Sequence, residues 1–339
     1  MCYVGLDISL SSASVCVVDQ EGAVLCETML LAEVADIARF LHSLPMHPVR
    51  VGLEAGPLSE WITAGLTDLG FTALSLESRQ VKAALSAMPV KTDRNDARGI
   101  AQVVRTGWFK AVHVKSIDSQ HARTLVAARK HLVRSVAATE QVIRGLLRPF
   151  GLKVGPTTKR SFAARVRELM GAQPVLSQAL EPLLAAREAL LREANGLHKT
   201  VLSTVRADPV CRRLMTMPGI GPVTTLSFRA TIDEPDRFRR SRSVGAYLGL
   251  TPRRYQSGEV DRVGCITKVG DVETRTALFE AANVVLRPGT RWSPMKAWAM
   301  RVADRQGAKR AKVALARKMA VALHCMWRDG TEFRWSAAA

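Results

Sequence analysis

The sequence lacks the features of a secreted, membrane-spanning or zinc-binding protein. Its six cysteines form no CxxC pair and no histidine-containing zinc spacing, so we expect free thiols in a reducing compartment. No run of 18 apolar residues occurs, and no basic stretch followed by an apolar one opens the chain, so we expect neither a membrane span nor a signal peptide. These absences predict a cytoplasmic protein with no membrane partner.

Acidic residues are scarce in one part of the chain only. The 339 residues carry a formal net charge of +19, and the apolar fraction of 47% excludes a disordered protein. Residues 1–115 hold 10 lysines and arginines against 12 acidic residues, a net charge of −2, whereas residues 116–339 hold 39 against 18, a net charge of +21. This asymmetry predicts that a near-neutral region performs chemistry while a basic region binds a polyanion.

Strand and helix signals alternate over the first 110 residues. The expected elements are strands at 3–8, 13–18 and 24–29, a helix at 32–44, a strand at 49–54, a helix at 57–70 and a strand at 71–76. Three strands followed by helix-connected ones are the order of an α/β ribonuclease H-like fold. That order places the fourth strand beside the first, where open α/β sheets carry their sites.

Four carboxylates fall at the ends of these elements. Asp7 lies near the end of the first strand and Glu54 ends the fourth, while Asp93 and Asp96 open a helix expected at about 92–107. Positions i and i+3 share a helix face, so these two aspartates should point the same way. An isolated DxxD usually marks a solvated helix start. The full set instead favours a site for Mg²⁺, with two ions roughly 3.5–4 Å apart as in phosphoryl transfer.

Three cations flank the aspartate pair in the segment KTDRNDARGIA, residues 91–101. They are Lys91, Arg94 and Arg98. Two roles are open for them, because they can either neutralise the aspartates directly or hold a phosphate beside the metal.

Apolar residues keep helical spacing between about 116 and 205. The first helix carries them at Leu125, Leu132, Val136, Ile143, Leu146 and Phe150. After a Gly/Pro-rich break and a short helix near 161–170, the spacing resumes at Leu176, Leu180, Leu183, Leu190, Ala194, Leu197 and Val201, with Arg187 as the polar exception. Heptad spacing predicts a coiled-coil-like hairpin. Packing within one chain and dimerisation both remain open.

A glycine-rich turn and a long basic stretch follow. In MPGIGPVTT, Met217–Thr225, Gly219 and Gly221 suggest a helix-hairpin-helix-like phosphate contact, with a plain turn between helices as the alternative. Beyond it, basic residues surround Ser257 in the turn Tyr255–Gly258, where a serine is by itself most often a turn residue. The basic side chains expected to contact nucleic acid here are Arg239, Arg240, Arg242, Arg253, Arg254, Arg262, Lys268 and Arg275.

The order and spacing of these segments resemble bacterial transposases of the insertion sequence 110 family. The matching segments are VGLDIS (4–9), VGLEAG (51–56), KTDRNDA (91–97), MPGIGPVT (217–224) and YLGLTPRRYQSGEVDRVGCITKVGD (247–271). The resemblance implies a RuvC-like DEDD domain in which Asp7, Glu54, Asp93 and Asp96 are catalytic metal ligands. It also implies that Ser257 attacks a DNA phosphate and forms a phosphoserine intermediate.

The same resemblance implies an organisation and a set of partners. The expected domains are a RuvC-like metal domain at 1–112, a helical heptad arm at 113–206, and a mainly α transposase domain with the serine at 207–339. The implied partners are double-stranded DNA from the element ends and target, a structured guide RNA encoded by the element, and further copies of the chain in a dimer or tetramer. We expect the protein to associate with the nucleoid when it acts.

Three other classes of protein share part of this pattern. A free-standing RuvC-like junction endonuclease needs the carboxylates but neither Ser257 nor the basic region. A non-catalytic DNA-binding protein needs none of the five site residues. A sugar kinase or actin-like ATPase opens with a similar strand and hairpin but requires later glycine-rich phosphate loops. The basic helix expected at 309–327 can either pack or bind nucleic acid.

Overall fold

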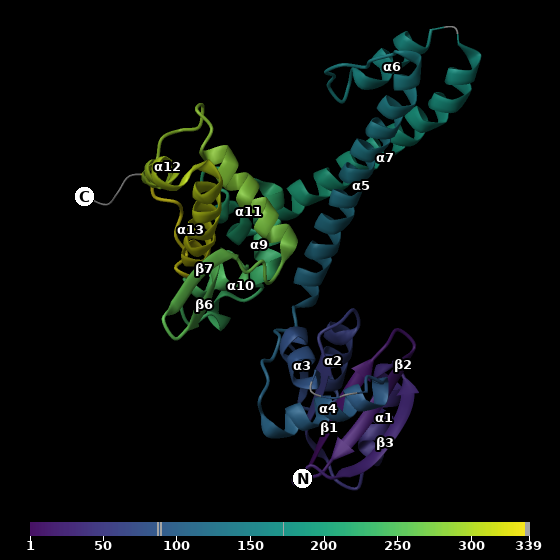
Figure 1. The fold of residues 1–339 in the computed structure, drawn as a ribbon, viewed down its shortest axis with the longest axis vertical. Helices are drawn as coiled ribbons and strands as arrows, with labels where there is room; N and C mark the ends of the chain where they lie inside the picture. Colours follow the sequence, from purple (N-terminus) through teal and green to yellow (C-terminus); the bar gives the residue numbers. More distant parts are fainter. Residues whose placement is uncertain (87, 89, 172, 336–339) are drawn as a thin grey trace. The chain divides into compact units, whose positions relative to one another are not determined.

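The computed structural model describes residues 1–86, 88, 90–171 and 173–335. The chain divides into two compact units, Met1–Lys115 and Ser116–Ala339 (Figure 1). Each unit has its own hydrophobic core. Within the described residues, no helix combines the length and the apolar character needed to cross a membrane.

The N-terminal unit contains a five-stranded sheet with the strand order β3-β2-β1-β4-β5. Its strands are β1 (Cys2–Ile8), β2 (Ser12–Val18), β3 (Val24–Leu31), β4 (Pro48–Glu54) and β5 (Ala73–Leu76). Strand β1 is antiparallel to β2 and parallel to β4. The expected strands are therefore confirmed, as is the position of the fourth strand beside the first.

Helices cover both faces of this sheet. They are α1 (Val34–Ser43), α2 (Ser59–Asp68), α3 (Ser78–Leu85) and α4 (Asp93–Thr106). Side chains alternate between faces along a strand, so Val4 and Leu6 pack with α1 and α2, while Cys16 and Val18 pack with α4. Helix α3 was not expected from the sequence.

The C-terminal unit begins with a long helical hairpin, which we call the arm. It comprises α5 (Ile117–Leu147), the 3₁₀ turn η1 (Arg148–Phe150), α6 (Phe162–Met170) and α7 (Pro174–Ala207). Val126 near the start of α5 packs with Val201 and Val205 near the end of α7, so the two long helices are antiparallel (Figure 1). The expected hairpin of helices is therefore present within one chain.

The buried stripe of the arm departs from the expected one at both ends. Val126 is buried where Leu125 was expected, while Leu146 and Phe150 are 46% and 57% exposed. At the far end of α5 the buried residues are Ile143 and Leu147, four residues apart. A straight α-helix has 3.6 residues per turn, so a strict heptad drifts off the contact face over a helix of this length.

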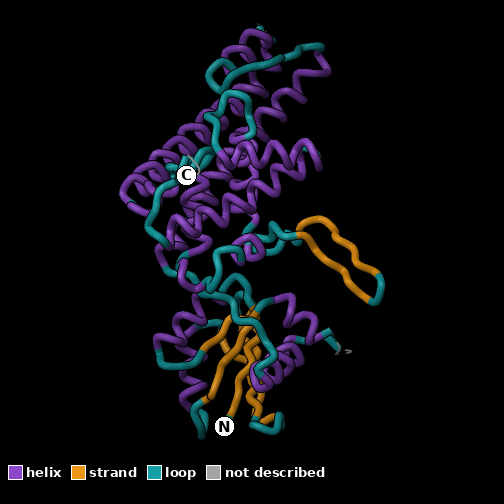
Figure 2. Tube along the Cα trace, turned by 90° about the vertical axis from the view of Figure 1, so that its left-hand side faces the viewer, coloured by secondary structure: helices purple, strands orange, loops and turns teal. Residues whose placement is uncertain are grey.

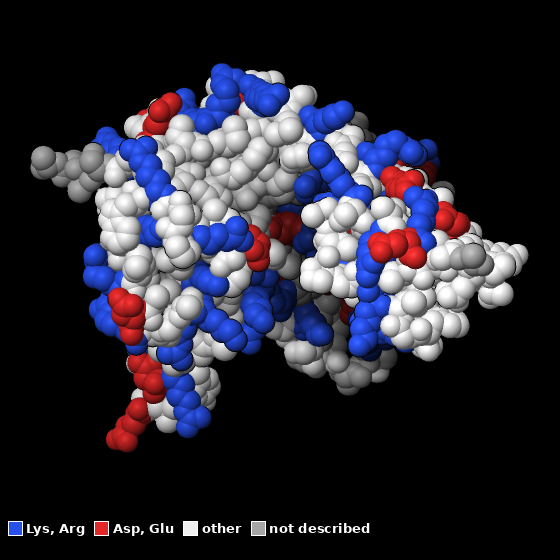
Figure 3. All heavy atoms as spheres, turned by 90° about the horizontal axis from the view of Figure 1, so that it is seen from above, with Lys and Arg blue, Asp and Glu red and all other residues white. Residues whose placement is uncertain are grey.

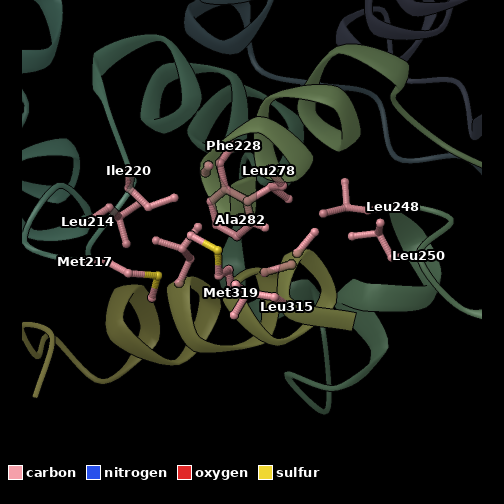
Figure 4. Packing of buried hydrophobic residues seen from close by; sticks show 14 of the residues in the cluster. Leu214, Met217, Ile220, Phe228, Leu248, Leu250, Leu278, Ala282, Leu315 and Met319 are labelled. Atoms are coloured by element: carbon pink, nitrogen blue, oxygen red, sulfur yellow. The ribbon is translucent and has the colours of Figure 1, made fainter. Parts of the chain in front are cut away.

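Helices around a second core complete the C-terminal unit. They are α8 (Pro209–Leu214), α9 (Pro222–Ile232), α10 (Ser243–Tyr247), α11 (Val272–Val285), α12 (Pro294–Gln306) and α13 (Ala308–Arg328), with the 3₁₀ turn η2 (Pro235–Arg237). Leu315 and Met319 of α13 pack against Phe228 of α9 and Leu278 of α11 (Figure 4). This core holds the expected mainly α region together.

A β-hairpin interrupts these helices. It is formed by β6 (Pro252–Ser257) and β7 (Val260–Ile266), and it projects from the helices of its own unit (Figure 2). Residues 252–265 are all exposed. The sequence suggested only a turn here, because a ribbon with no buried face lacks the alternation of apolar and polar residues that marks a strand.

Candidate functional site

Asp7 and Glu54 end neighbouring parallel strands at the same level. The register of β1 and β4 pairs Leu6 with Leu53, and Asp7 and Glu54 are the next residues of each strand. Since side chains two residues apart lie on the same face, Asp7 shares a face with Gly5, and Glu54 with Gly52. Both carboxylates therefore project from the sheet face that α4 covers.

Two glycines let α4 lie directly on this face. A Cβ atom at Gly5 would come within 2.2 Å of the backbone of Ala97 and Ala101 in α4, and one at Gly52 would meet the Val104 side chain at 2.2 Å. No larger residue fits at Gly5 without moving the helix. The close contact fixes the first turn of α4, which carries Asp93 and Asp96, near the end of β1.

Helix α4 begins and ends where its sequence predicts. The Thr92 hydroxyl accepts a hydrogen bond from the Asn95 amide at 3.2 Å, and Gly107 closes the helix with a φ of 73°. Thr92 is thus an N-cap, and Gly107 supplies the left-handed residue that commonly follows a helix. Asp93 and Asp96 occupy the first turn, where a carboxylate interacts favourably with the helix dipole.

The electrostatics of Asp7 indicate that the four carboxylates are neighbours. Burial, together with the negative charges of Asp93, Asp96 and Glu54, raises the pKa of Asp7 to about 6, and only Lys91 opposes the rise. Nearby negative charges disfavour the ionised form of a carboxyl, and burial adds to that effect at Asp7. Asp93, Asp96, Glu54 and Lys91 therefore all lie within electrostatic reach of Asp7.

The four carboxylates offer hard oxygen donors, the ligand type that Mg²⁺ prefers. Among the described residues, no three acidic, histidine or cysteine side chains stand close enough together to hold a metal ion. The donor chemistry of these residues and the raised pKa of Asp7 fit a divalent cation. A cavity of about 210 Å³ is lined by Glu54 together with Pro57 and Ser59.

Arg94 and Arg98 bind a residue that the sequence interpretation missed. Glu27 of β3 accepts hydrogen bonds from Arg94 Nε at 2.6 Å and from Arg98 Nη2 at 2.9 Å. The hydrogen bond from Arg94 holds the pKa of Glu27 below its usual range. Both arginines are thus paired with Glu27 rather than with Asp93 or Asp96. A lone carboxylate within the apolar strand VLCETMLL was the signal for this partner.

Ser257 belongs to the C-terminal unit and is the last residue of β6. It pairs with Val260 across the two-residue turn Gly258–Glu259, so it lies in a strand and not in the turn expected from the sequence. No hydrogen bond to its hydroxyl occurs among the described residues, and the side chain is exposed. The structure leaves this hydroxyl accessible at the tip of the hairpin.

The hairpin separates its basic residues onto two faces. Directly paired residues share a face, which places Tyr255 and Arg262 with Ser257, and Arg254 with Asp261 on the other side. Arg254 Nη2 lies 2.6 Å from Asp261 Oδ2, so its charge is paired. No carboxylate partner of Arg262 occurs among the described residues. Arg262 is therefore a free cation on the face of Ser257.

Of the other basic residues near the hairpin that were predicted to contact nucleic acid, Arg275 and Arg253 donate hydrogen bonds to backbone carbonyls, and Lys268 is exposed. Arg275 donates to the carbonyl oxygens of Leu248 and Val269 at 3.1 and 3.0 Å, which supports the loop after β7. Lys268 in that loop is exposed and has a φ of 57°, an uncommon value for a residue with a side chain. Arg253 donates to the Thr267 carbonyl at 3.4 Å.

The turn between α8 and α9 gives its two glycines different surroundings. Gly219 has a φ of 80°, and a Cβ atom there would lie 2.6 Å from the Ala281 carbonyl oxygen of α11. Packing against α11 therefore explains Gly219. Nothing lies within 4 Å of a Cβ at Gly221, which leaves space beside its backbone. Only Gly221 offers the open approach to a ligand that the sequence suggested for both.

Arg239, Arg240 and Arg242 are exposed on a segment that a buried histidine anchors. His324 of α13 is inaccessible to solvent, and its ring nitrogens lie 3.0 Å from Ser241 Oγ and 2.9 Å from the Pro235 carbonyl oxygen. Burial lowers the pKa of His324, so its ring is neutral near pH 7. No motif around His324 in the sequence identifies this anchor.

Comparison with known proteins identifies the family of the chain. A family model described as a DEDD transposase of the IS110 type matches residues 4–151, and one described as the transposase IS116/IS110/IS902 family matches residues 211–299. The chain is also 30% identical to a transposase for insertion sequence element IS1111A from Coxiella burnetii, over 93% of this chain and 86% of that protein. The chain belongs to the IS110/IS116/IS902 family of transposases.

Two further transposases align with almost the whole chain. A probable family 20 transposase from Pseudomonas aeruginosa is 29% identical over 98% of each chain. A transposase for insertion sequence element IS1328 from Yersinia enterocolitica is 24% identical over 97% of this chain and 98% of that protein. The relationship thus includes the carboxylate site, the arm and the β-hairpin. DNA is accordingly the substrate class of this insertion-sequence transposase.

Proposed function

We propose that this transposase cuts and rejoins DNA by using a DEDD metal site together with a serine nucleophile. Asp7, Glu54, Asp93 and Asp96 would hold Mg²⁺, as two ions. When bound there, the metal supplies positive charge against the scissile phosphate. The observation that carries this proposal is the placement of Asp7 and Glu54 at the same level of neighbouring strands, on the sheet face against which α4 packs with Asp93 and Asp96 in its first turn. The raised pKa of Asp7 supports it, since perturbed pKa values are common at functional sites.

In this mechanism Ser257 Oγ attacks the phosphorus of one DNA strand. A bond forms between Oγ and phosphorus while a phosphorus–sugar oxygen bond breaks, so the number of phosphate ester bonds is unchanged. The proton leaves the serine hydroxyl, and the released sugar oxygen takes up a proton. Arg262, free and on the same face of the hairpin, is suited to stabilise the phosphate charge. The accessible hydroxyl of Ser257 supports its role as nucleophile.

Lys91, Arg94 and Arg98 would have separate roles. Lys91 lies within electrostatic reach of Asp7, so it is suited to orient a phosphate beside the metal. Glu27 holds both arginines, because its Oε2 accepts from Arg94 and its Oε1 accepts from Arg98. Each guanidinium therefore retains donors for a DNA phosphate, and the Glu27 contact reduces the conformational entropy lost on binding.

The family resemblance also implies a fold, a phosphate contact, a guide RNA and an oligomer, and we include these in the proposal. We infer that the N-terminal unit has the ribonuclease H-like fold, which its strand order β3-β2-β1-β4-β5 supports. The turn at Gly221 would act as a helix-hairpin-helix-like phosphate contact. An element-encoded guide RNA would select donor and target DNA. The arm would join protomers in a dimer or tetramer, and the protein would act on the nucleoid in the cytoplasm.

The test is a search for a covalent protein–DNA adduct. Full-length protein is incubated with DNA carrying the element junction, the element RNA and Mg²⁺, and adducts are separated under denaturing conditions. Ser257→Ala should abolish the adduct, whereas Ser203→Ala, which removes another exposed hydroxyl of the same unit, should retain it. An adduct that persists in Ser257→Ala would falsify the serine mechanism.

The carboxylate role is tested in the same reaction, by the amount of adduct that forms. Asp96→Asn should reduce adduct formation by at least about 100-fold, the lower range for loss of a group that stabilises transition-state charge. Asp68→Asn, at an exposed position ending α2, serves as the matched control. Equal activity in the Asp96 and Asp68 variants would remove the metal site from the mechanism. Recovery of a discrete element-derived RNA with the purified protein checks the guide-RNA proposal.

A further inference from the structure

Helix α13 both packs and presents a charged surface. Ala311, Leu315, Met319 and Leu323 repeat at four-residue steps and are completely buried in the C-terminal unit. The remaining faces of the helix carry most of its lysines and arginines. The packing alternative left open by the sequence is therefore confirmed, and the exposed cations need a separate explanation.

The exposed cations of α13 continue onto α12. Residues 301–318 contain seven lysines and arginines and a single acidic residue, Asp304. Six of the seven are exposed and Lys312 is half-buried. We call this set the α12–α13 basic face: Arg301, Arg305, Lys309, Arg310, Lys312, Arg317 and Lys318.

None of these seven cations forms a salt bridge with any described residue. Three arginines of the arm differ in this respect, since Arg165, Arg167 and Arg192 each lie within 3.2 Å of a glutamate oxygen. Clustered unpaired cations repel one another and cost folding stability. An external anion would remove that cost.

Contacts between the two helices make the basic face continuous. The Lys318 ammonium of α13 lies 4.3 Å from the centre of the Trp298 ring of α12, so this pair joins the two helices. Within α12, Arg305 Nε donates to the Arg301 carbonyl at 3.2 Å. Trp298, Arg301 and Arg305 follow one stripe of α12, while Arg310 and Arg317 are two turns apart on α13, about 10 Å along its axis. The charges are therefore spread along an extended surface, as a polymeric anion requires. Lysine and arginine side chains also outnumber acidic ones on the molecular face drawn in Figure 3.

We propose that the α12–α13 basic face binds the phosphodiester backbone of double-stranded DNA. Binding of unpaired strands usually adds aromatic side chains on which bases stack. Within α12 and α13, all of whose residues are described, the only exposed large apolar side chain is Met300, and Trp298 lies beneath Lys318. The face is thus equipped to neutralise phosphates without reading sequence, which suits the DNA that flanks a reaction site.

The experiment measures binding of full-length protein to a duplex of about 40 base pairs and arbitrary sequence over a range of salt concentrations. The test variant carries Arg301→Gln, Arg305→Gln, Lys309→Gln and Arg310→Gln, all at exposed positions. We expect the affinity at about 0.1 M salt to fall about tenfold or more. The slope of log K against log salt should become shallower by about 0.9 for each phosphate that the variant no longer neutralises.

A matched variant separates a local effect from a change in total charge. Arg148→Gln, Lys153→Gln, Lys159→Gln and Arg160→Gln remove the same charge from exposed positions at the tip of the arm, where these cations have no carboxylate partner among the described residues. Affinity and slope should stay near wild type in this variant. Equal losses in both variants, or no loss in the α12–α13 variant, would overturn the proposal.

A further binding series replaces the DNA with an RNA duplex of the same length. A larger loss for RNA than for DNA would assign the face to RNA and overturn the proposal. Thermal denaturation should give melting temperatures within about 2 °C for both variants, since they alter only exposed side chains. The adduct assay at low salt should still detect the Ser257 product in the α12–α13 variant, so this inference and the proposed mechanism fail independently.

Discussion

At the scale of single residues, Asp7 is a proposed metal ligand whose ionised carboxylate lowers the folding stability of the N-terminal unit. Its pKa rises from 3.8 to about 6 through burial and three neighbouring carboxylates. The folded protein therefore holds this proton more tightly than the unfolded chain does. The contribution of the protonated Asp7 carboxyl to folding stability is fully present below pH 3.8 and is lost as the pH rises through about 6. At neutral pH without metal, Asp7 destabilises the N-terminal unit.

Asp7→Asn should therefore stabilise the metal-free protein at about pH 7.5. We expect a gain of about 1 kcal/mol, a value discounted for the partial solvent exposure of the site and the opposing charge of Lys91. Thermal denaturation in EDTA at that pH and at about pH 4 measures it, and the gain should shrink at the lower pH. Adding Mg²⁺ should raise the melting temperature of wild type more than that of the variant. A less stable variant at the higher pH would contradict this electrostatic interpretation.

His324 is a positioning residue for the arginine segment that precedes α10. Its neutral ring accepts a hydrogen bond at one nitrogen and donates at the other, so Ser241 and Pro235 are both satisfied. Because burial lowers its folded pKa below 6.5, this contribution is present above pH 6.5 and is lost as the pH falls through the folded value.

His324→Ala should destabilise the C-terminal unit by about 2–4 kcal/mol, since it leaves a cavity and an unpaired buried carbonyl. Urea denaturation at about pH 7.5 measures the loss. Between that pH and about pH 5, wild type should lose more stability than the variant does. Identical pH dependence in the two proteins would show that the histidine is not the titrating group.

At the scale of elements, a buried ion pair holds the arm together. Arg187 of α7 is 2% exposed, lies 2.6 Å from Glu140 of α5, donates to the Lys159 carbonyl and stacks 4.8 Å from the centre of the Phe162 ring. One side chain thus connects both long helices with the segment between them. The polar exception in the predicted apolar stripe therefore has a structural role within the arm.

Arg187→Ala should destabilise the C-terminal unit by about 3–5 kcal/mol, because it removes a buried side chain that packs on Phe162 and leaves Glu140 without its partner. Chemical denaturation measures the change. Combining Arg187→Met with Glu140→Leu should recover most of the loss, since apolar pairs often replace buried ion pairs at little cost. Arg192→Ala, in an exposed pair with Glu193, should change stability by only about 0.5 kcal/mol.

Local patterns in the sequence predicted the elements better than they predicted contacts. The strands of the sheet and both ends of α4 follow from apolar runs, the cap at Thr92 and the glycine at 107. The contact of Glu27 with Arg94 and Arg98 joins residues 67 and 71 positions apart, which no local pattern encodes. The ribbon of β6 and β7 was not predicted because neither of its faces is buried.

At the scale of the whole molecule, the boundary between the two compact units is also the boundary between a near-neutral and a strongly basic part of the chain. The two compact units meet at Lys115 and Ser116, and each contains its own buried clusters. The same boundary separates a net charge of −2 from one of +21. The carboxylate cluster and the serine hairpin thus reside in units of very different charge.

Each unit should therefore fold alone. Residues 1–115 and 116–339, expressed separately, should each unfold cooperatively in calorimetry, because neither needs the other to complete its core. On a heparin column the 116–339 fragment should elute at a salt concentration similar to that of the full chain, and the 1–115 fragment should pass through. A 1–115 fragment without a cooperative transition would show that its core depends on the rest of the protein.

The absence of a side chain at Gly5 has a consequence for which mutated copies of this insertion sequence remain active. Insertion sequences accumulate mutations, and an inactive copy is usually recognised by a frameshift or a missing catalytic residue. Helix α4 lies against β1 at a distance that admits no Cβ atom. A copy that retains Asp7, Glu54, Asp93, Asp96 and Ser257 but has acquired any other residue at position 5 should therefore already be immobile.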